Sequence, residues 1–483
     1  MYMFNLGKNI FLFLISICFT SILFAQSAYD NAPPFSFNEI KMIRRNLFNN
    51  IATHQHVFTK KDLNRIIIST PGAILASPSN HDPFFSQDYQ FHWVRDAALT
   101  MNEVVYLYAH SSDRERKILK SYLMYYIEYE KQAQRYILGE PKYNLDGTVF
   151  EGDWARPQND GPALRAITLM NILHELKNTE PQAWIRNIYY RMVVKDLDYI
   201  ELHWHDFSYD LWEEVNDQDH FFTKMVQRKA LIVGANWAKT FDDYTRYQVY
   251  KNIANQLSLS LMNHWDGNRG YYTETLKQLN YKGGGLNISI LLGVLYGAVD
   301  SPNDAFSLNE DKILKTIYAL RQAFALEYPI NRNHLEQVPL MGRYPNDIYD
   351  GDQFILGNPW ILTTAALAQY YYALAQLFLK QGYVVVDKDN LLFFQQIDPA
   401  ITYIGMIKDK QFHRIIHQLI LQGDTLLMRI KSLGLCYAKD DCYHYAEQID
   451  RTTGKQTSAK DLTWGYVAIL QAMQYRTQRI AVT

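Results

Sequence analysis

The stretch Pro359-Trp-Ile-Leu-Thr-Thr-Ala-Ala-Leu-Ala-Gln-Tyr-Tyr-Tyr-Ala-Leu-Ala-Gln-Leu-Phe-Leu379 decides the fold class. It begins with a proline, which is tolerated at the first position of a helix, and it is apolar on almost every face. A helix without a polar face belongs inside a large structure. Other segments, such as Tyr244 to Met262, carry polar and apolar residues on different faces. We therefore predict a barrel in which an inner ring of helices is covered by an outer ring.

Apolar residues at helical spacing recur along the chain from about Asn38 onward, separated by short polar, glycine or proline breaks. Stretches typical of strands are scarce, so the pattern predicts an all-α protein. The expected helices cover residues 38–51, 96–110, 115–134, 160–177, 182–202, 219–240, 243–264, 284–298, 311–327, 359–381, 409–431 and 461–478. Neither an internal repeat of fixed period nor a Ser/Thr/Pro-rich linker is found, and we predict one domain over residues 30–483.

The composition narrows the class of protein. Aromatic residues make up 14% of the chain, which suits aromatic-lined pockets as well as thick helical cores. The 48 basic and 50 acidic residues leave a net charge of -2, so there is no broad basic field for a nucleic acid. Three cysteines exclude a disulfide-stapled scaffold, and the chain has no C-x2-C pair or H-E-x-x-H run for zinc. We expect neither a nucleic-acid partner nor a metal.

The N-terminus carries an apolar run at residues 10–24 that ends in small residues. The run has about 15 residues, whereas a membrane-spanning helix needs about 20. We predict a signal peptide at residues 1–25, a secreted protein that is extracellular or periplasmic, and no membrane span after cleavage. Cleavage leaves Cys436 and Cys442, which could pair across a short turn or stay reduced.

Three carboxylates, Asp210, Glu213 and Glu214, stand beside Leu211 and Trp212. Ionising all three in one partly buried site is costly, so one of them is expected to keep its proton near neutral pH. A carboxylic acid of that kind can protonate a leaving-group oxygen, as the acid of a glycosidase does. The alternative is an acidic helix start, in which Asp210 and Glu213 form a capping box ahead of the next helix.

A glycosidase needs a second carboxylate, and Glu447 is the candidate. It stands between Tyr445 and Gln448, just before the last expected helix. Only closure of a barrel could bring it close to Glu213. In an inverting enzyme the two carboxyl groups are about 6.5 to 9.5 Å apart, which leaves space for the attacking water. The alternative is a solvated glutamate on a loop.

Charged and aromatic residues near these carboxylates could bind a sugar. Arg95, Asp96 and Arg343 could make charged hydrogen bonds to sugar hydroxyls, or they could form ordinary ion pairs. Adjacent residues do not share a helix face, so Arg95 and Asp96 are expected to have different partners. Indole rings could stack on sugar faces or simply pack a core, and the candidates are Trp93, Trp154, Trp212 and Trp360.

Seven blocks of sequence around these candidates follow one another in a recognisable order. They are His92-Trp-Val-Arg-Asp96, Trp154-Ala-Arg-Pro-Gln-Asn-Asp-Gly-Pro-Ala-Leu-Arg165, Asp210-Leu-Trp-Glu-Glu-Val215, Phe221-Phe-Thr223, Gly342-Arg-Tyr-Pro345, Gly357-Asn-Pro-Trp360, and Glu447-Gln448 with Ala459-Lys-Asp-Leu-Thr-Trp-Gly-Tyr466. Together they resemble glycoside hydrolase family 15, the glucoamylases, over nearly the whole mature chain.

The resemblance implies an (α/α)6 barrel that releases β-glucose, with inversion, from the non-reducing ends of α-1,4-glucans such as starch, glycogen and maltodextrins. It implies that Glu213 is the general acid and Glu447 the general base, with Asp210 and Glu214 contributing to substrate binding and site electrostatics. Residues implied to line the pocket for the terminal glucose are Tyr89, Trp93, Arg95, Asp96, Leu211, Trp212 and Arg343, with Trp154 near the next sugar. The implied mechanism needs no cofactor, and we expect a monomer.

Other interpretations stay open at this stage. An inverting α-glucosidase for trehalose or dextran could use the same barrel, and so could a non-catalytic carbohydrate-binding or regulatory protein. The run Asn346 to Leu356 is longer than in many relatives, so the preference for chain length could differ. Asn287-Ile-Ser289 is a glycosylation sequon that has meaning only in a host that modifies secreted chains.

Overall fold

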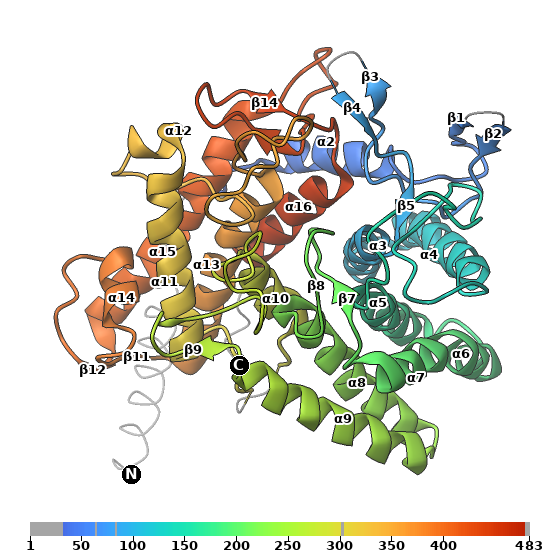
Figure 1. Ribbon diagram of the computed structural model, residues 1–483, viewed down its shortest axis with the longest axis horizontal. Coiled ribbons are helices and arrows are strands. Elements are labelled where there is room, and N and C mark those ends of the chain that lie inside the picture. The colour runs from blue at the N-terminus through green and yellow to red at the C-terminus, as the bar shows by residue number, and fades with distance from the viewer. Residues whose placement is uncertain (1–31, 63–64, 83–84, 301–303, 479–483) are drawn as a thin grey trace, which may run out of the picture.

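A closed ring of helices forms the centre of the computed structural model, which describes residues 32–62, 65–82, 85–300 and 304–478 (Figure 1). In these ranges the inner ring consists of α3 (Val94–Ala109), α5 (Asp160–Leu176), α8 (Phe221–Thr240), α10 (Ser289–Gly297), α13 (Ile361–Gln381) and α16 (Thr463–Thr477). Each helix packs against the next one along the chain, and α16 packs against α3 to close the ring.

The outer ring alternates with the inner ring along the chain. Its helices are α2 (Phe37–Phe48), α4 (Asp113–Ala133), the segment α6 (Gln182–Ile188), η1 (Tyr189–Val193) and α7 (Val194–His203), then α9 (Tyr244–Met262), α11 (Asp311–Glu327) and α15 (Asp409–Leu433). Six pairs of one outer and one inner helix, counted over the described ranges, make an (α/α)6 barrel. The predicted all-α, double-ring architecture is confirmed.

The helix α13 shows why the pattern predicts a barrel. Its side chains are buried on every side from Ile361 to Ala375, and it ends at Gly382, whose φ of 76° is a left-handed conformation that suits glycine. The outer helix α15 instead buries one stripe, which includes Phe412, Ile416 and Leu419. An inner helix such as α13 is thus buried on all sides, whereas an outer helix such as α15 is buried on one side only.

All twelve expected helices are present, with some differences at their ends. The helix expected to begin at residue 284 begins at Ser289 as α10. The segment expected at 182–202 is interrupted by the π-helical turn η1. Two short helices had no clear periodic pattern, and the sequence did not predict them: α12 (Pro329–Arg332) and α14 (Leu391–Ile397). Among the described residues, no helix is long and apolar enough to cross a membrane.

The strands are short antiparallel pairs in the connections between helices. In the described part of the chain they are β1 (Thr59–Asp62) with β2 (Arg65–Ile68), β3 (Asn80–Asp82) with β4 (Phe85–Asp88), β5 (His92–Trp93) with β6 (Lys142–Tyr143), β7 (Ser208–Tyr209) with β8 (Asn216–Asp217), β9 (Trp265–Asp266) with β10 (Tyr271–Tyr272), β11 (Val384–Val386) with β12 (Gly405–Ile407), and β13 (Gln448–Ile449) with β14 (Gln456–Thr457). These strand pairs shape the connecting loops and do not interrupt the two rings of helices.

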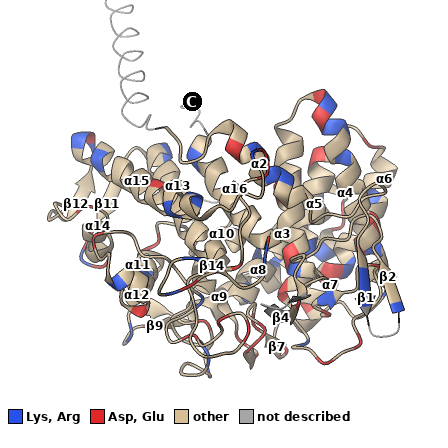
Figure 2. Cartoon of the chain, turned by 90° about the horizontal axis from the view of Figure 1, so that it is seen from above, with Lys and Arg blue, Asp and Glu red and all other residues tan. Residues whose placement is uncertain are grey.

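Charged residues of both signs are interspersed over the molecule (Figure 2). Figure 2 shows blue and red segments mixed on helices such as α2 and α7, while α10 is tan. This distribution agrees with the balanced net charge of the sequence.

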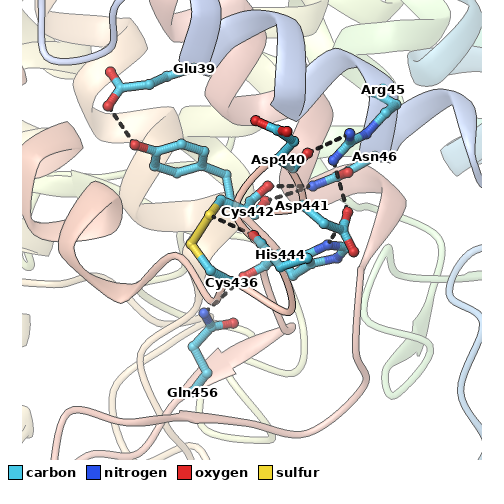
Figure 3. Close-up of a disulfide and its surroundings, with 11 residues drawn as sticks. Glu39, Arg45, Asn46, Cys436, Asp440, Asp441, Cys442, His444 and Gln456 are labelled. Atoms are coloured by element: carbon cyan, nitrogen blue, oxygen red, sulfur yellow. Dashed lines mark hydrogen bonds and ion pairs between the residues drawn. A yellow bond between two sulfur atoms is a disulfide. The ribbon is translucent and has the colours of Figure 1, made fainter.

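Cys436 and Cys442 form a disulfide in the loop that follows α15 (Figure 3). The same loop is tied to α2, because Asn46 Nδ2 donates to the carbonyl oxygen of Cys442 at 3.0 Å. Arg45 Nη2 donates to Asp441 Oδ1 at 2.8 Å. The sequence left open whether Cys436 and Cys442 pair or stay reduced, and in the structure they are paired. The predicted signal peptide at residues 1–25 lies outside the described residues.

A buried ion network links the inner and outer rings. Arg165 on α5 has no exposed surface and donates to both oxygens of Asp196 on α7, at 2.6 and 2.8 Å. It also donates to Glu130 Oε2 on α4 at 3.1 Å. Glu130 Oε1 is 2.9 Å from His92 Nε2, and Asp196 accepts from Gln134 at 2.8 Å. One guanidinium therefore balances two buried carboxylates from two outer helices.

We expect Arg165→Met to lower the free energy of unfolding by about 3 to 5 kcal/mol, because it leaves two buried carboxylates without their counter-charge. Urea denaturation followed by circular dichroism measures this loss. The matched control is Arg246→Met, which removes a half-buried bridge to Asp198 between α9 and α7. That change should cost about 1 kcal/mol or less. Equal losses in the two variants would contradict the structural role of the network.

Candidate active site

A cavity of about 380 Å³ lies where several inner helices begin. Its wall includes Trp93, which precedes α3, Trp360, which precedes α13, and Trp464 at the start of α16. The residues suggested by the sequence that line it are Tyr89, Trp93, Arg95, Asp96, Trp154, Leu211, Trp212, Glu213, Glu214, Arg343 and Glu447. Asp210 is not among the lining residues.

Glu213 sits in the loop that joins β7 to β8. Its backbone has a φ of 66°, which is a left-handed conformation that a non-glycine residue rarely adopts. The backbone N–H of Glu213 donates to the carbonyl oxygen of Asp210 at 2.9 Å, which closes the turn. Uncommon backbone conformations of this kind concentrate at functional sites, where the surrounding structure holds them in place.

Asp210 holds this loop from behind the cavity wall. It is buried, and its Oδ1 accepts from the backbone N–H groups of Glu214 and Val215, both at 2.8 Å. The alternative of a capping box ahead of α8 is therefore wrong, since α8 begins after His220 with no side-chain cap. The carboxylate of Asp210 shapes the turn that presents Glu213 and Glu214.

The carboxylate of Glu213 accepts hydrogen bonds from three side chains. Trp93 Nε1 donates to Oε1 at 2.7 Å, and Gln158 Nε2 donates to the same oxygen at 3.0 Å. Trp154 Nε1 donates to Oε2 at 3.0 Å, and Arg95 Nη2 lies 3.6 Å from Oε1. These donors fix the orientation of the side chain. The two tryptophans thus act as donors in addition to lining the cavity.

Lys142 on β6 lies over the Trp154 ring, and no role was predicted for this residue from the sequence. Its Nζ is 3.1 Å from the centroid of the Trp154 ring, 4.2 Å from that of Phe150 and 4.7 Å from that of Trp93. Burial lowers the pKa of Lys142 to about 7, although the charge of Glu213 opposes this shift. These three rings, together with that of Phe91 at 4.5 Å, favour the protonated amine. Lys142 supports the indoles that hold Glu213.

Arg95 has main partners other than Asp96, whereas the main charged neighbour of Asp96 is Arg95, so the expectation of different partners holds for Arg95 alone. Arg95 Nη1 donates to Asp160 Oδ2 at 2.6 Å and to Gln158 Oε1 at 3.1 Å. Its Nε is still 4.0 Å from Asp96 Oδ2. Burial raises the pKa of Asp96 to about 7; Arg95 lowers it and Glu213 raises it further. Asp96 therefore lines the cavity as a carboxyl group that exchanges its proton near neutral pH.

Arg343 is the centre of a second charged cluster. Its guanidinium binds both oxygens of Asp347, at 2.8 and 2.7 Å, and donates to Glu214 Oε1 at 3.1 Å. The Tyr344 hydroxyl donates to Glu214 Oε2 at 2.5 Å. Tyr344 is the next residue after Arg343 and Asp347 lies four residues after it, but the role of these two residues was not predicted from the sequence. Glu214 is thus held by two donors while it faces the cavity.

Glu447 is 2% exposed, so the alternative of a solvated loop glutamate is wrong. The Tyr89 hydroxyl donates to Oε1 at 3.0 Å, while Ser458 Oγ and Gln448 Nε2 donate to Oε2 at 2.5 and 3.1 Å. Burial raises the pKa of Glu447, and these donors oppose the rise. Tyr349 extends this series of hydrogen bonds, because its hydroxyl oxygen is 2.8 Å from that of Tyr89. Ser458 and Tyr349 were not predicted from the sequence.

Trp212, Trp360 and Trp464 pack together in the wall of the cavity. The rings of Trp212 and Trp464 are stacked with centroids 6.3 Å apart, and Trp212 is 5.6 Å from Trp360. Trp212 Nε1 donates to Asn287 Oδ1 at 3.0 Å, and Asn287 Nδ2 donates to the Gly283 carbonyl at 2.9 Å. Asn287 is therefore buried and both groups of its amide are hydrogen-bonded, which argues against glycosylation of the sequon.

Across the described ranges, no group of three or more His, Cys, Asp or Glu side chains is placed to hold a metal ion. The cavity instead brings together Glu213 and Glu447, whose surroundings differ. Arginine side chains, further carboxyl groups and several aromatic rings line the same cavity. A glycoside hydrolase needs one carboxyl group that protonates the glycosidic oxygen and one carboxylate that activates water. Two carboxylates in one aromatic cavity meet this need. The fold and the site therefore define this class of enzyme.

The comparisons with known proteins identify the family. The model of glycosyl hydrolases family 15 matches residues 59–474. A glucoamylase from Blastobotrys adeninivorans is 34% identical over 84% of this chain and 67% of its own length. The solved glucoamylase from Saccharomycopsis fibuligera superposes with a TM-score of 0.79 at 28% identity, over 94% of this chain and 99% of that structure. The chain belongs to glycosyl hydrolases family 15.

The relatives differ in where they work. The intracellular, sporulation-specific glucoamylase of Saccharomyces cerevisiae is 29% identical over 85% of this chain and 79% of its own length. The family therefore includes enzymes that stay inside the cell, and membership alone does not assign a compartment.

Proposed function

We propose that the protein is an exo-acting, inverting glucoamylase that releases β-glucose from the non-reducing ends of α-1,4-glucans. The observation that supports this most directly is that Glu213 and Glu447 enter one cavity and are held by different donors. Two indole N–H groups and one amide hold Glu213, whereas two hydroxyl groups and one amide hold the buried Glu447. Two environments of this kind suit two carboxyl groups with opposite tasks.

Glu213 is the proposed general acid. It gives a proton to the glycosidic oxygen as the bond to the departing chain breaks. The carboxylate that remains is already surrounded by the N–H donors of Trp93, Trp154 and Gln158. Because these donors do not have to reorganise, the negative charge that develops on Glu213 is stabilised as it forms.

Glu447 is the proposed general base. It accepts a proton from a water molecule that attacks the anomeric carbon from the opposite face, which inverts the configuration. Tyr89 and Ser458 fix the carboxylate and keep a lone pair directed toward the water. Burial raises the pKa of Glu447 and makes the carboxylate a stronger base than an exposed glutamate.

The terminal glucose is proposed to occupy the inner end of the cavity. Asp96, Arg95, Glu214 and Arg343 line this cavity and offer charged partners for hydroxyl groups. A cavity of about 380 Å³ suits a chain end better than the middle of a long glucan. This size supports attack at chain ends. An enzyme for trehalose or dextran, and a silent carbohydrate-binding protein, are the alternatives that the tests below exclude.

We also propose that residues 30–483 act as one monomeric catalytic domain that is secreted after cleavage of residues 1–25. The apolar run near the N-terminus and the disulfide between Cys436 and Cys442 support an oxidising compartment outside the cytoplasm.

We expect proton NMR of the purified protein with maltoheptaose to show β-glucose as the first product. An inverting enzyme that removes terminal units produces this anomer before mutarotation mixes the signals. Early α-glucose would contradict the inverting mechanism. An early burst of short maltodextrins would contradict attack at chain ends, and turnover of trehalose or dextran alone would establish a different linkage.

Glu213→Gln should lower kcat for maltoheptaose by at least about 10³-fold, because the amide keeps the shape but has no acidic proton to give. Binding of maltoheptaose, followed by quenching of tryptophan fluorescence, should stay within a few-fold of the unchanged protein. The control is Glu128→Gln on the exposed surface of α4. Retention of most of the kcat would refute the assignment of Glu213.

Ser458→Ala should shift the acidic limb of the kcat/KM profile to higher pH, by about half a unit to one unit. A general base works only as the carboxylate, so activity falls as pH drops through its pKa. Burial already raises the pKa of Glu447, and loss of the Ser458 donor raises it further. Ser432→Ala, at an exposed serine of α15, is the control. An acidic limb that does not move would contradict an influence of Ser458 on the pKa of the general base.

A further inference from the structure

The loop between Arg343 and Trp360 contributes an aromatic ring to the cavity. Phe354 belongs to the run Asn346–Leu356, and its side chain is among those that line the cavity with Glu213 and Glu447. The residue is nevertheless 47% exposed. A large apolar ring that is half exposed at the edge of a polar site offers a face for a ligand.

The loop is held by its own polar contacts. Asp350 Oδ1 accepts from the backbone N–H groups of Asp352, Gln353 and Phe354, at 3.0, 2.6 and 3.1 Å. These N–H donors lower the pKa of Asp350 despite its partial burial, so it remains an anion. Gln87 Nε2, from the opposite side of the cavity wall, donates to the Gly351 carbonyl at 3.3 Å. The position of Phe354 is therefore fixed before a substrate arrives.

Phe354 keeps an unfavourable backbone conformation. Its φ is 56°, a left-handed value that bulky residues rarely adopt. Burial of the ring does not account for this choice, because about half of the side chain faces solvent. Glycine or asparagine would fit the same turn with less strain. A phenylalanine at this position is explained by a task for the ring.

The ring is connected to the proposed base through other side chains. Phe354 packs against Tyr349 with the centroids 5.2 Å apart, and the Tyr349 hydroxyl lies 2.8 Å from that of Tyr89. Tyr89 in turn donates to Glu447. Trp154 and Lys282 line the same cavity from other loops. The ring is thus linked to Glu447 through Tyr349 and Tyr89, and it is exposed to solvent where they are buried or half-buried.

We infer that Phe354 sets the preference for chain length by stacking on a glucose unit of the departing chain, beyond the two units that flank the bond to be cleaved. This inference rests on the proposed function. A maltose molecule is too short to reach the ring, whereas maltotriose and longer α-1,4-glucans extend across it. A glucose unit whose apolar face covers the exposed ring adds to the binding free energy of the substrate. Only long substrates gain this contribution.

The test is a comparison of kcat/KM for maltose, maltotriose and maltoheptaose between the unchanged protein and Phe354→Ala. The ratio of kcat/KM for maltoheptaose to that for maltose should fall about tenfold, as expected for loss of one aromatic contact. The change should appear mainly in KM, because stacking far from the bond binds ground state and transition state alike. Phe354→Tyr keeps the ring and should restore the ratio.

The control variant is Ile355→Ala, since Ile355 is 60% exposed on the same loop and is not a lining residue of the cavity. It should leave the ratio unchanged. An equal loss for all three substrates in Phe354→Ala would mean that the residue only supports Tyr349, and it would overturn the inference. An unchanged ratio would overturn it as well. An unchanged protein without activity on any maltooligosaccharide would instead refute the proposed function.

Discussion

The deep burial of the inner helices is the constraint on which the rest of the structure depends. A helix such as α13 has no polar side for water, so each inner helix needs neighbours all around, and the chain must return outside the ring after each one. The segments before α3, α13 and α16 consequently meet at one end, where Trp93, Trp360 and Trp464 line one cavity. The positive ends of these helix dipoles point toward the same place and favour carboxylates there.

The proposed chemistry depends on two glutamates that differ in their surroundings within this one cavity. Glu213 stands on a hairpin loop and receives N–H donors from segments that precede α3 and α5. Glu447 lies buried between β13 and α13 and receives hydroxyl donors from Tyr89 and Ser458. The residue type is the same in both cases. The difference in solvent exposure and donors suits the division of tasks that we propose, with Glu213 as the acid and Glu447 as the base.

Local patterns made the fold predictable, and motif order made most of the site predictable. Helical periodicity depends on neighbours in the sequence, so all twelve helices were found, whereas short α12 and α14 carried too few periods. The spacing of Asp210 and Glu213 suggested a capping box, but Asp210 instead binds two backbone N–H groups of its own turn. Lys142 and Ser458 act only through contacts with distant residues, which a single sequence does not display.

The cavity also concentrates backbone strain that the barrel must support. Glu213, Phe354 and Ser458 have φ values of 66°, 56° and 71°, and all three line the cavity or bind a residue that does. Each costs about 1 to 2 kcal/mol relative to an ordinary conformation. Loops that were free to relax would lose these geometries. The ion network around Arg165 and the closed ring of helices keep the loop ends apart at fixed positions, so the rigid barrel is what makes a strained and preorganised site possible.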